Sequence, residues 1–588
     1  MRENTVRHGS RLALAVAALL ALFQGGCGAP APNVFSEMVD EFLEGYFAAH
    51  PVTATAIGAH RHDHALDDLS EEAVAAEIQR LREFETRRAA LPADDLDHND
   101  RIDLEVLGEK IEAELLELEE IQSWKHDPLV YTQTVGSGIH LLLARDFAPL
   151  EERLEDAASR LEAVPRLLEQ AKQNLDNPPR IHTETAIRQN QGNIRLIRED
   201  LARAAAGHPA LQARIEEASG PALEALQGFQ TFLEDDLLPR SEGDFRLGHN
   251  LFRRKLALTL QSNLPPEEIQ RRAWAEFFRV REEMAALARG LYEEYFPGSR
   301  IREGDSHFEQ VMVGKVLNRI ADDHPTEDNV LPFIRETLSR LESFIGENDL
   351  LTLDKSQTLE VTWMPEFSRG VAIAGLESPG PLETGALKAF YYVMPIPEEW
   401  SDREAESFFR EYNDHMVQIL TIHEAMPGHF VQIYHANRHP SVVRQVFGSG
   451  TFIEGWAVYC ERMMTEAGYM DHDPRLKLQQ LKFYLRTVVN AILDWEIHAV
   501  QMNEAGALDL MINGGYQEPS EAQGKWTRAR LTSTQLSTYF VGIQDVLDLR
   551  DKYREARGDE FTLKEFHGAL LAHGSLAPKY MERVLIQP

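Results

Sequence analysis

The sequence predicts a mostly α-helical protein with one small β-sheet. Over most of the chain, apolar residues recur at the three- and four-residue spacing of a helix face, and prolines interrupt several of these runs. Residues 358–397 differ, because they hold short β-branched or aromatic runs separated by glycine and proline. No repeat of fixed period and no low-complexity linker breaks the pattern. We therefore expect one large helical body with a sheet inserted in it.

The expected helices follow in chain order. The first covers residues 35–46, and Pro51 ends it, because proline cannot continue the hydrogen-bond ladder of a helix. The same apolar spacing recurs from Leu150 and is expected to stop at Pro165. Two more amphipathic helices are expected, over residues 331–345 and 416–423.

Three short strands are expected within residues 358–397, namely Leu359–Trp363, Val371–Ala374 and Phe390–Val393. We expect them to form a small antiparallel sheet. The sheet comes directly before the histidine segment described below, so its edge could supply backbone hydrogen bonds to an extended peptide in an active-site cleft. Strands that only cap the helical core are the simpler alternative.

Composition narrows the class of protein. With 588 residues, 43% hydrophobic and 26% charged, the chain is typical of a globular protein with a substantial core. The 95 acidic and 60 basic residues give a net charge of −35, which repels nucleic acid phosphates, so we expect no nucleic acid partner. We expect a single body over residues 35–588, with two lobes that divide near residue 300. The sequence specifies no oligomeric state.

The first 26 residues have the layout of an export signal peptide. Three arginines precede the apolar run 12–23, which is too short to span a membrane stably, and no later stretch approaches the roughly 20 apolar residues of a spanning helix. Two glycines directly before Cys27 resemble the lipobox of bacterial lipoproteins, in which the cysteine is lipidated and becomes the new N-terminus. Gln24 stands where that pattern prefers an aliphatic residue. A plain secreted or periplasmic protein is the alternative.

We therefore expect an exported protein of the periplasm or cell envelope, with residues 27–34 as a tether. Its only contact with the membrane would be the lipid on Cys27. The other cysteine, Cys460, then has no partner, so no disulfide framework stabilises the fold.

Two histidines and a glutamate within residues 423–429 indicate a metal site. Neutral imidazoles suit zinc, and a neighbouring carboxylate can accept a proton from a metal-bound water. In the familiar H-E-x-x-H helix the histidines lie four residues apart, about 40° around the helix axis, and face one ion. His423 and His429 lie six residues apart, which on a regular helix places them about 120° apart. A regular helix therefore cannot hold one ion between them.

Pro427 changes this expectation. It lacks the N–H that would bond the carbonyl of His423, and its ring crowds that carbonyl, so the helix must bulge or kink. With Gly428 beside it, the bulge can return His429 to the place of an i+4 histidine. The alternative is a helix that ends at Met426, with both histidines as ordinary polar residues.

A catalytic zinc ion needs a third protein ligand, and Glu454 is the best candidate. It lies on an apolar helix predicted over residues 451–461, where an unpaired carboxylate is costly to bury. Glu461 falls on the same face and could hold a ligand histidine from behind, or it could be a solvated or salt-bridged glutamate. His435 and His439 are weaker alternative ligands.

These segments resemble a family of exported bacterial proteins, domain-of-unknown-function family 885, which is marked by H-E-x-x-P-G-H followed by E-G-W-A-x-Y. The resemblance covers nearly the whole mature chain and includes three further segments, at residues 51–58, 243–248 and 391–395. The family is similar in logic to helical zinc peptidases such as thimet oligopeptidase, angiotensin-converting enzyme and carboxypeptidase Taq. It implies zinc ligands His423, His429 and Glu454, with Glu424 as the general base.

The resemblance also implies residues around the reacting group. Asp494 and His498 are i, i+4 on one predicted helix, with Asp494 supporting the histidine. Arg528, Gln535, Tyr539 and Gly542 resemble a family stretch in which Ser533-Thr534 here replace Pro-Gly. Tyr539 and His498 are candidate donors to the oxyanion. Candidate substrate contacts are Tyr391, Tyr392, Arg528 and Gln535. For each, a buried polar residue with a structural partner is an equal alternative.

Together these features predict a zinc metallopeptidase, and the similarity to helical zinc peptidases implies that it acts on short peptides in a groove between helical lobes. One alternative is a non-catalytic lipoprotein that binds a metal or a peptide, with turnover abolished by the altered histidine spacing. Another is a zinc hydrolase of a non-peptide amide or ester.

Overall fold

The computed structural model describes residues 34–586, except 93, 95, 303, 357, 365–373, 386 and 398–399. The predicted signal peptide, Cys27, nearly all of the tether and the segment Val371–Ile373 lie outside the described residues. Within the described part, no helix is both long enough and apolar enough to cross a bilayer. Cys460 is free and buried.

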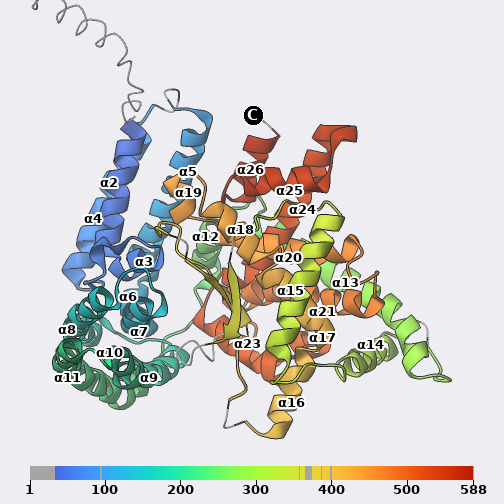
Figure 1. The fold of residues 1–588 in the computed structure, drawn as a ribbon, viewed down its shortest axis with the longest axis horizontal. Helices are drawn as coiled ribbons and strands as arrows, with labels where there is room; N and C mark the ends of the chain where they lie inside the picture. The colour runs from blue at the N-terminus through green and yellow to red at the C-terminus, as the bar shows by residue number, and fades with distance from the viewer. Residues whose placement is uncertain are drawn as a thin grey trace, which may run out of the picture.

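The prediction of a mostly α-helical protein is confirmed (Figure 1). The N-terminal helices are α2 (Val34–Ala49), α3 (Pro51–Ala56), α4 (Glu71–Ala90) and α5 (His98–Leu116). A group of helices follows at the lower left of Figure 1, namely α6 (Ser123–His126), α7 (Leu129–Ala144), α8 (Leu150–Asn174), α9 (Arg180–Arg195), α10 (Ala202–Ala205) and α11 (Pro209–Thr231).

The remaining helices form the larger part of the molecule. Those before the histidine segment are α12 (Gly248–Leu260), α13 (Pro266–Tyr295), α14 (Ser306–Ile320), α15 (Val330–Glu347) and α16 (Asp402–Glu411). Those that carry or follow it are α17 (Asp414–Glu424), α18 (His429–Ala436), α19 (Val442–Val446), α20 (Gly450–Glu466), α21 (Pro474–His498), α22 (Glu504–Asp509), α23 (Pro519–Leu531), α24 (Thr538–Arg557), α25 (Leu563–Leu571) and α26 (Pro578–Leu585).

Two buried apolar clusters hold these helices together. The smaller cluster draws its side chains from residues 52–237, mainly from α7, α8, α9 and α11. The larger cluster contains the rest of the core, and α2, α4 and α5 join it although they precede the smaller cluster in the chain. The two clusters therefore interleave in sequence. The expected division into two lobes near residue 300 stays a prediction.

One expected helix end is wrong, because α8 continues through Pro165 to Asn174. Proline removes the hydrogen bond to the carbonyl of Leu161 and costs about 3 kcal/mol in a helix interior. The side chains of Leu161, Val164 and Leu168 on either side are fully buried. Since each buried leucine or valine contributes about 1.5–3 kcal/mol, tertiary packing outweighs the local cost.

The expected sheet exists and one of its two strand pairs is antiparallel as predicted, but the other pair is parallel. Strands β1 (Leu359–Trp363) and β3 (Ala389–Val393) pair in parallel, and β2 (Ala374–Glu377) pairs with β3 antiparallel. The order is β1-β3-β2, so β3 inserts between two strands that are neighbours in sequence. The chain must therefore enter β1 and β3 in the same direction. Local patterning reveals strands but not this order, which depends on the long connection after β2.

The sheet lies near the middle of the molecule, between the N-terminal helices and α15 (Figure 1). On α15, the Arg335 Nη2 donates to the Val361 carbonyl in β1 at 2.7 Å. The stretch around β2 is fastened to the N-terminal helices by two ion pairs. Arg145 Nη2 lies 2.9 Å from Glu377 Oε1, and His60 Nε2 lies 3.1 Å from Glu383 Oε2. The Leu376 N–H of β2 bonds Glu424, which places β2 beside the helix that carries His423.

Candidate metal centre

The helix that carries the histidine segment is broken between Glu424 and His429. Helix α17 ends at Glu424 and α18 begins at His429, across a cis peptide bond between Met426 and Pro427. The Gly428 N–H donates at 3.0 Å to the carbonyl of Ile422, six residues back rather than four. The distortion expected at Pro427 and Gly428 is therefore present.

Gly428 is required by a close backbone approach. A β-carbon at this position would lie only 1.9 Å from the carbonyl oxygen of His423, so no other residue fits without moving the chain. The turn is also held from α20, where the Trp456 indole Nε1–H donates to the Pro427 carbonyl at 2.9 Å. As a result the rings of His423 and His429 meet edge to face, with centroids 4.7 Å apart.

Glu454 of α20 completes a cluster with the two histidines. Its Oε2 lies 3.7 Å from His423 Nε2 and 3.5 Å from His429 Nε2, and one ligand atom from each residue lies within 4.8 Å of the others. Two atoms that each bind a tetrahedral ion at ~2.0–2.2 Å are roughly 3.3–3.6 Å apart. Glu454 Oε2 is buried and has no hydrogen-bond partner among the described residues. The cluster therefore fits one small divalent cation.

The electrostatics of the cluster also favour a cation. Burial alone would raise the pKa of the Glu454 carboxyl, but its contacts with His423 and His429 outweigh burial and hold that pKa well below its usual range. Burial likewise lowers the pKa of His423, and the contacts with Glu454 and Glu461 reverse this and raise it well above its ordinary value. The site thus stabilises positive charge between its carboxylates.

Glu461 supports the candidate ligand His423 by binding its other ring nitrogen. It is fully buried on α20, and its Oε1 accepts a hydrogen bond from His423 Nδ1 at 2.7 Å. That bond keeps a proton on Nδ1, so that Nε2, which faces Glu454, is the nitrogen that could bind an ion. The alternative of a solvated glutamate is therefore wrong. His435 and His439 do not belong to the cluster of metal-ligating side chains found among the described residues.

Glu424 lies between the cluster and the sheet. It directly follows His423 and is half-buried. Its Oε2 accepts a hydrogen bond from the Leu376 backbone N–H in β2 at 3.1 Å. Because β2 is an edge strand, this bond leaves the carboxylate beside an unpaired stretch of backbone.

Tyr539 approaches the cluster from α24. Its hydroxyl lies 3.3 Å from Gln535 Nε2 and 3.5 Å from Arg528 Nη2, while Arg528 also donates to Gln535 Oε1 at 2.7 Å. Burial raises the pKa of Tyr539, and the negative charge of Glu454 raises it further. The structure thus brings together three predicted residues, Arg528, Gln535 and Tyr539, next to the third candidate ligand.

A contact between two glycines fixes the helices that carry Glu454 and Tyr539. A β-carbon on Gly455 would lie 2.3 Å from backbone atoms of Gly542, and one on Gly542 would lie 2.1 Å from the Thr451 carbonyl oxygen. Helices α20 and α24 therefore touch backbone to backbone. Because Glu454 directly precedes Gly455 and Tyr539 lies one turn before Gly542, the crossing sets their separation.

Asp494 and His498 make different contacts from those expected. The His498 Nε2 lies 2.9 Å and 3.0 Å from the carbonyls of Ala529 and Thr532, and its ring stacks on Phe252. The carboxylate of Asp494 accepts from the Thr534 N–H and from both the N–H and hydroxyl of Ser537. Both side chains brace the loop from α23 to α24. They support the helix of Tyr539, and the Nε2 of the histidine is occupied by these two carbonyls.

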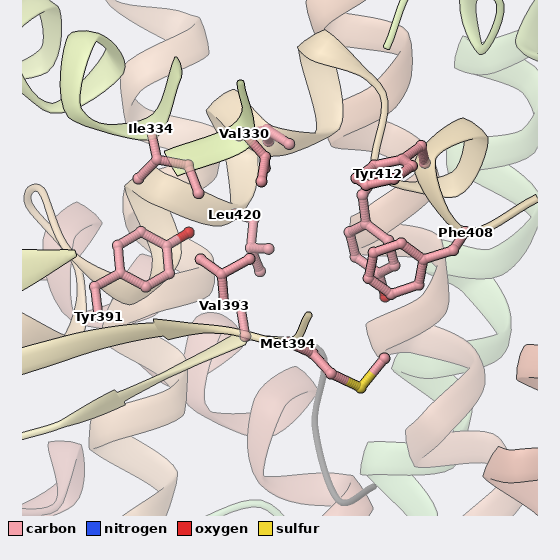
Figure 2. A pocket seen from close by; sticks show the side chains of 11 residues that line it. Val330, Ile334, Tyr391, Val393, Met394, Phe408, Tyr412 and Leu420 are labelled. Carbon is pink, nitrogen blue, oxygen red and sulfur yellow. The ribbon is translucent and has the colours of Figure 1, made fainter. Parts of the chain in front are cut away.

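Tyr391 and Tyr392 lie on opposite faces of β3. Tyr391 is fully buried, and its hydroxyl lies 3.4 Å from Thr421 Oγ1 on α17, which gives it a packing role. Tyr392 is half-buried and stacks on Phe390. Figure 2 shows Tyr391, Val393 and Leu420 around an apolar pocket of about 20 Å³. That volume holds roughly one water molecule, so the pocket is too small for a peptide side chain.

Sequence reasoning passed over two residues near the cluster. Phe483 of α21 meets the ring of His423 edge to face, with centroids 6.0 Å apart. Lys525 of α23 is buried one turn before Arg528. The i, i+3 spacing of Lys525 and Arg528 is the signal that could have found the lysine, because it places both on one helix face. Nothing in the sequence indicates the position of Phe483.

A buried His–His–Glu cluster in a mostly α fold defines this as a helical protein with a site suited to a single metal ion. The chain belongs to the family described as bacterial protein of unknown function (DUF885), whose model matches residues 51–585. The predicted resemblance to that family is confirmed. No curated protein matches the chain.

Two solved structures are similar over most of the chain. One is a candidate lipoprotein of unknown function from Shewanella oneidensis, with 30% sequence identity and a TM-score of 0.82, covering 94% of this chain and 100% of its own. The other is a candidate lipoprotein from Colwellia psychrerythraea, with 17% identity and a TM-score of 0.77, covering 94% and 98% of the two chains. The second likeness concerns the fold alone.

Proposed function

We propose that the protein is a zinc-dependent peptidase of the cell envelope that cleaves short peptides. The observation that carries the proposal is the cluster of His423, His429 and Glu454 with the carboxylate of Glu424 directly beside it. Two imidazoles and one carboxylate are the donor set of helical catalytic zinc sites, which keep a fourth position open.

Zinc is favoured over harder cations by the donor set. Calcium and magnesium take six or more oxygen ligands, whereas this cluster offers two nitrogens and one carboxylate oxygen. Bound zinc would supply a Lewis acid that polarises the scissile carbonyl and acidifies a water.

The residues around the cluster have separate tasks in this proposal. Glu461 keeps the proton of His423 on Nδ1, so that Nε2 remains a ligand. Glu424 accepts a proton from the attacking water and passes it to the leaving amine. The hydroxyl of Tyr539, held by Gln535 and Arg528, donates to the oxyanion that develops on the scissile carbonyl.

The edge of β2 is suited to hold the peptide chain. The Leu376 N–H points out of the sheet toward Glu424, and an extended peptide along this edge would place its backbone next to the general base. Such pairing recognises backbone and not particular side chains, which supports short peptides as substrates.

The protein is exported to the cell envelope. Its N-terminal sequence has the layout of a signal peptide followed by Cys27, and both similar solved structures are described as candidate lipoproteins. We infer that a lipid on Cys27 anchors the chain and that residues 27–34 tether it. The net charge of −35 keeps the folded part away from anionic lipid head groups.

The test is to purify the full-length chain in detergent, measure bound metal by mass spectrometry, and incubate it with a mixed library of short peptides. We expect one zinc ion per chain and cleavage that Glu424→Gln abolishes while zinc remains bound. Zinc retained with no peptide cleaved would favour a non-catalytic binding protein. Cleavage of only non-peptide amides or esters would identify a different hydrolase, and absence of zinc binding would refute the proposal.

A further inference from the structure

A lysine on α23, the helix that also carries Arg528, is buried without a carboxylate of its own. Lys525 is 6% exposed, and the carboxylate that acts on it, Glu521, pairs with Arg486. Burial, followed by the positive charge of Arg486, lowers the pKa of Lys525 well below its ordinary value, and Glu521 offsets only part of this effect. A buried amine without a carboxylate of its own is costly, so a ligand that brings a carboxylate would stabilise it.

The charges around Lys525 do not balance. Two of the neighbouring cations have a carboxylate of their own, because Lys482 contacts Glu411 at 2.8 Å and Arg486 contacts Glu521. Arg528 bonds only to the neutral side chains of Gln535 and Tyr539, and it adds to the positive field at Lys525. Lys525 and Arg528 are therefore two cations without a carboxylate partner in a chain with a net charge of −35.

Both residues project from one face of α23. They lie three residues apart, which puts their β-carbons about 5–6 Å apart on a helix. Two cations at this spacing can bind the two oxygens of one carboxylate, since charge-assisted hydrogen bonds to both oxygens are stronger than one. Lys525 and Arg528 thus form a pair of cations to which no anion is bound in the described part of the chain.

Two routes through neighbouring groups link this pair of cations to the metal cluster. On one side, Phe483 meets His423 edge to face, and the guanidinium of Arg486 lies 5.7 Å from the centre of the Phe483 ring. The positive charge of Arg486 in turn lowers the pKa of Lys525.

On the other side, Arg528 contacts the hydroxyl of Tyr539 at 3.5 Å, and Tyr539 lies in the field of Glu454. Both routes start at a candidate metal ligand and meet at α23.

We propose that Lys525 and Arg528 bind a carboxylate of the substrate, so that the enzyme prefers peptides with a negative group close to the scissile bond. This inference rests on the proposed peptidase function. The carboxylate is either the free C-terminus of a short peptide or an acidic side chain. In the first case the enzyme trims peptides from the C-terminal end.

The test uses the zinc-loaded full-length chain and two matched peptide pairs. One pair differs only in a free C-terminal carboxylate against a C-terminal amide, and the other only in glutamate against glutamine. Cleavage gives kcat/KM for the wild type, and calorimetric binding to the Glu424→Gln variant gives Kd without turnover. We expect the carboxylate-bearing member of at least one pair to be favoured about tenfold in both quantities.

Lys525→Met should remove this preference by weakening the carboxylate peptide and leaving the amide or glutamine peptide unchanged. If that variant does not fold, Arg528→Gln tests the same preference through the ratio within each peptide pair, because loss of its contact with Tyr539 lowers cleavage of both members alike. Arg530→Met is the matched control, because Arg530 belongs to the same helix but stacks over Trp526 and donates to the Trp526 carbonyl. It should keep the wild-type preference, and all variants should keep wild-type zinc content.

The pair that shows the preference identifies the source of the carboxylate. Equal kcat/KM and equal Kd within both pairs would overturn the inference while cleavage itself upholds the peptidase proposal. A preference that survives in both Lys525→Met and Arg528→Gln would also overturn it. If no peptide is cleaved, the peptidase proposal fails, and the Kd values alone decide whether the subsite binds a carboxylate.

Discussion

His423 and His498 are both buried, and each lies near the end of a helix and near a buried carboxylate. They differ in the groups that their Nε2 atoms face. In α17, His423 gives its Nδ1–H to Glu461 at 2.7 Å, and its Nε2 faces Glu454 and His429. In α21, the Nε2 of His498 faces two backbone carbonyls at 2.9 Å and 3.0 Å. A nitrogen that faces only carbonyl oxygens must carry a proton, so it has no lone pair for a metal.

The difference shows that the number of acidic neighbours does not make a histidine a ligand. What matters is which ring nitrogen the neighbour occupies. Glu461 accepts the hydrogen bond from the His423 nitrogen that lies away from the cluster. The Nε2–H of His498 is instead bound by carbonyls at the end of α23 and just after it. Asp494, the carboxylate nearest to His498 in sequence, binds the backbone of the loop after α23.

Removal of a ligand should have the largest effect on this comparison. We expect His429→Ala to reduce zinc affinity by more than the ~10–100-fold that loss of an outer partner causes, since it removes one of three protein ligands. Competition with a zinc-binding dye measures the affinity. His498→Gln is the control, and a similar loss in that variant would show that the two histidines are not different in kind.

Glu461→Gln tests the partner of the ligand. The amide can still accept the bond from His423 Nδ1 but no longer offers a negative charge, so zinc affinity should fall by about 10–100-fold. Competition with the same zinc-binding dye measures this affinity. Glu466→Gln, on the same helix and paired with Arg462 at the surface, should leave the affinity unchanged. An unchanged affinity in Glu461→Gln would mean that the carboxylate does not tune the ligand.

Asp494→Asn should lower the free energy of unfolding without changing metal binding. The amide replaces one of the two acceptor oxygens with N–H donors, which then face the donors of either Thr534 or Ser537, so we expect a loss of about 1–3 kcal/mol in the free energy of unfolding. Urea denaturation measures it, and zinc bound per chain should not change. Asp551→Asn removes only a surface pair with Arg554 and should cost less than about 1 kcal/mol. Loss of zinc in Asp494→Asn would contradict the bracing role.

A third histidine, His60, should show the smallest effect. Its contribution to the stability of the fold should depend on pH. Burial lowers its pKa, but the bonds to Asp63 and Glu383 outweigh burial and raise it to about 9. Because the folded value exceeds the ordinary 6.5, the contact stabilises the protein fully below about pH 6.5 and is lost as pH rises through about 9.

The thermal midpoints of wild type and His60→Gln, measured between pH 6 and pH 10, give this contribution. The gap between the two proteins should be widest at low pH and should close at high pH. A gap that stays constant with pH would show that His60 acts only by packing.

Much of the site was predictable because a few residues break local rules. Glu454 and Glu461 are acidic residues on an otherwise apolar helix, and Pro427 and Gly428 interrupt a helix next to two histidines. Such violations have a cost that only a tertiary partner offsets, so they identify positions with a special environment.

The errors have a common cause, since each depends on a partner that is distant in sequence. Asp494 and His498 have a spacing that suits either a site or a brace, and only the loop after α23 decides between them. Pro165 lies within a helix because the packing around it is strong. The parallel pairing of β1 with β3 follows from the order of strands, which local patterns do not contain.

The contact of Gly455 with Gly542 restricts how the site can change over evolutionary time. Helices α20 and α24 have no side chain between them at their crossing, so neither can shift or rotate without a backbone collision. A substitution at the crossing would therefore move Glu454 and Tyr539 together, whereas α23 and the edge of β2 lie outside this glycine contact.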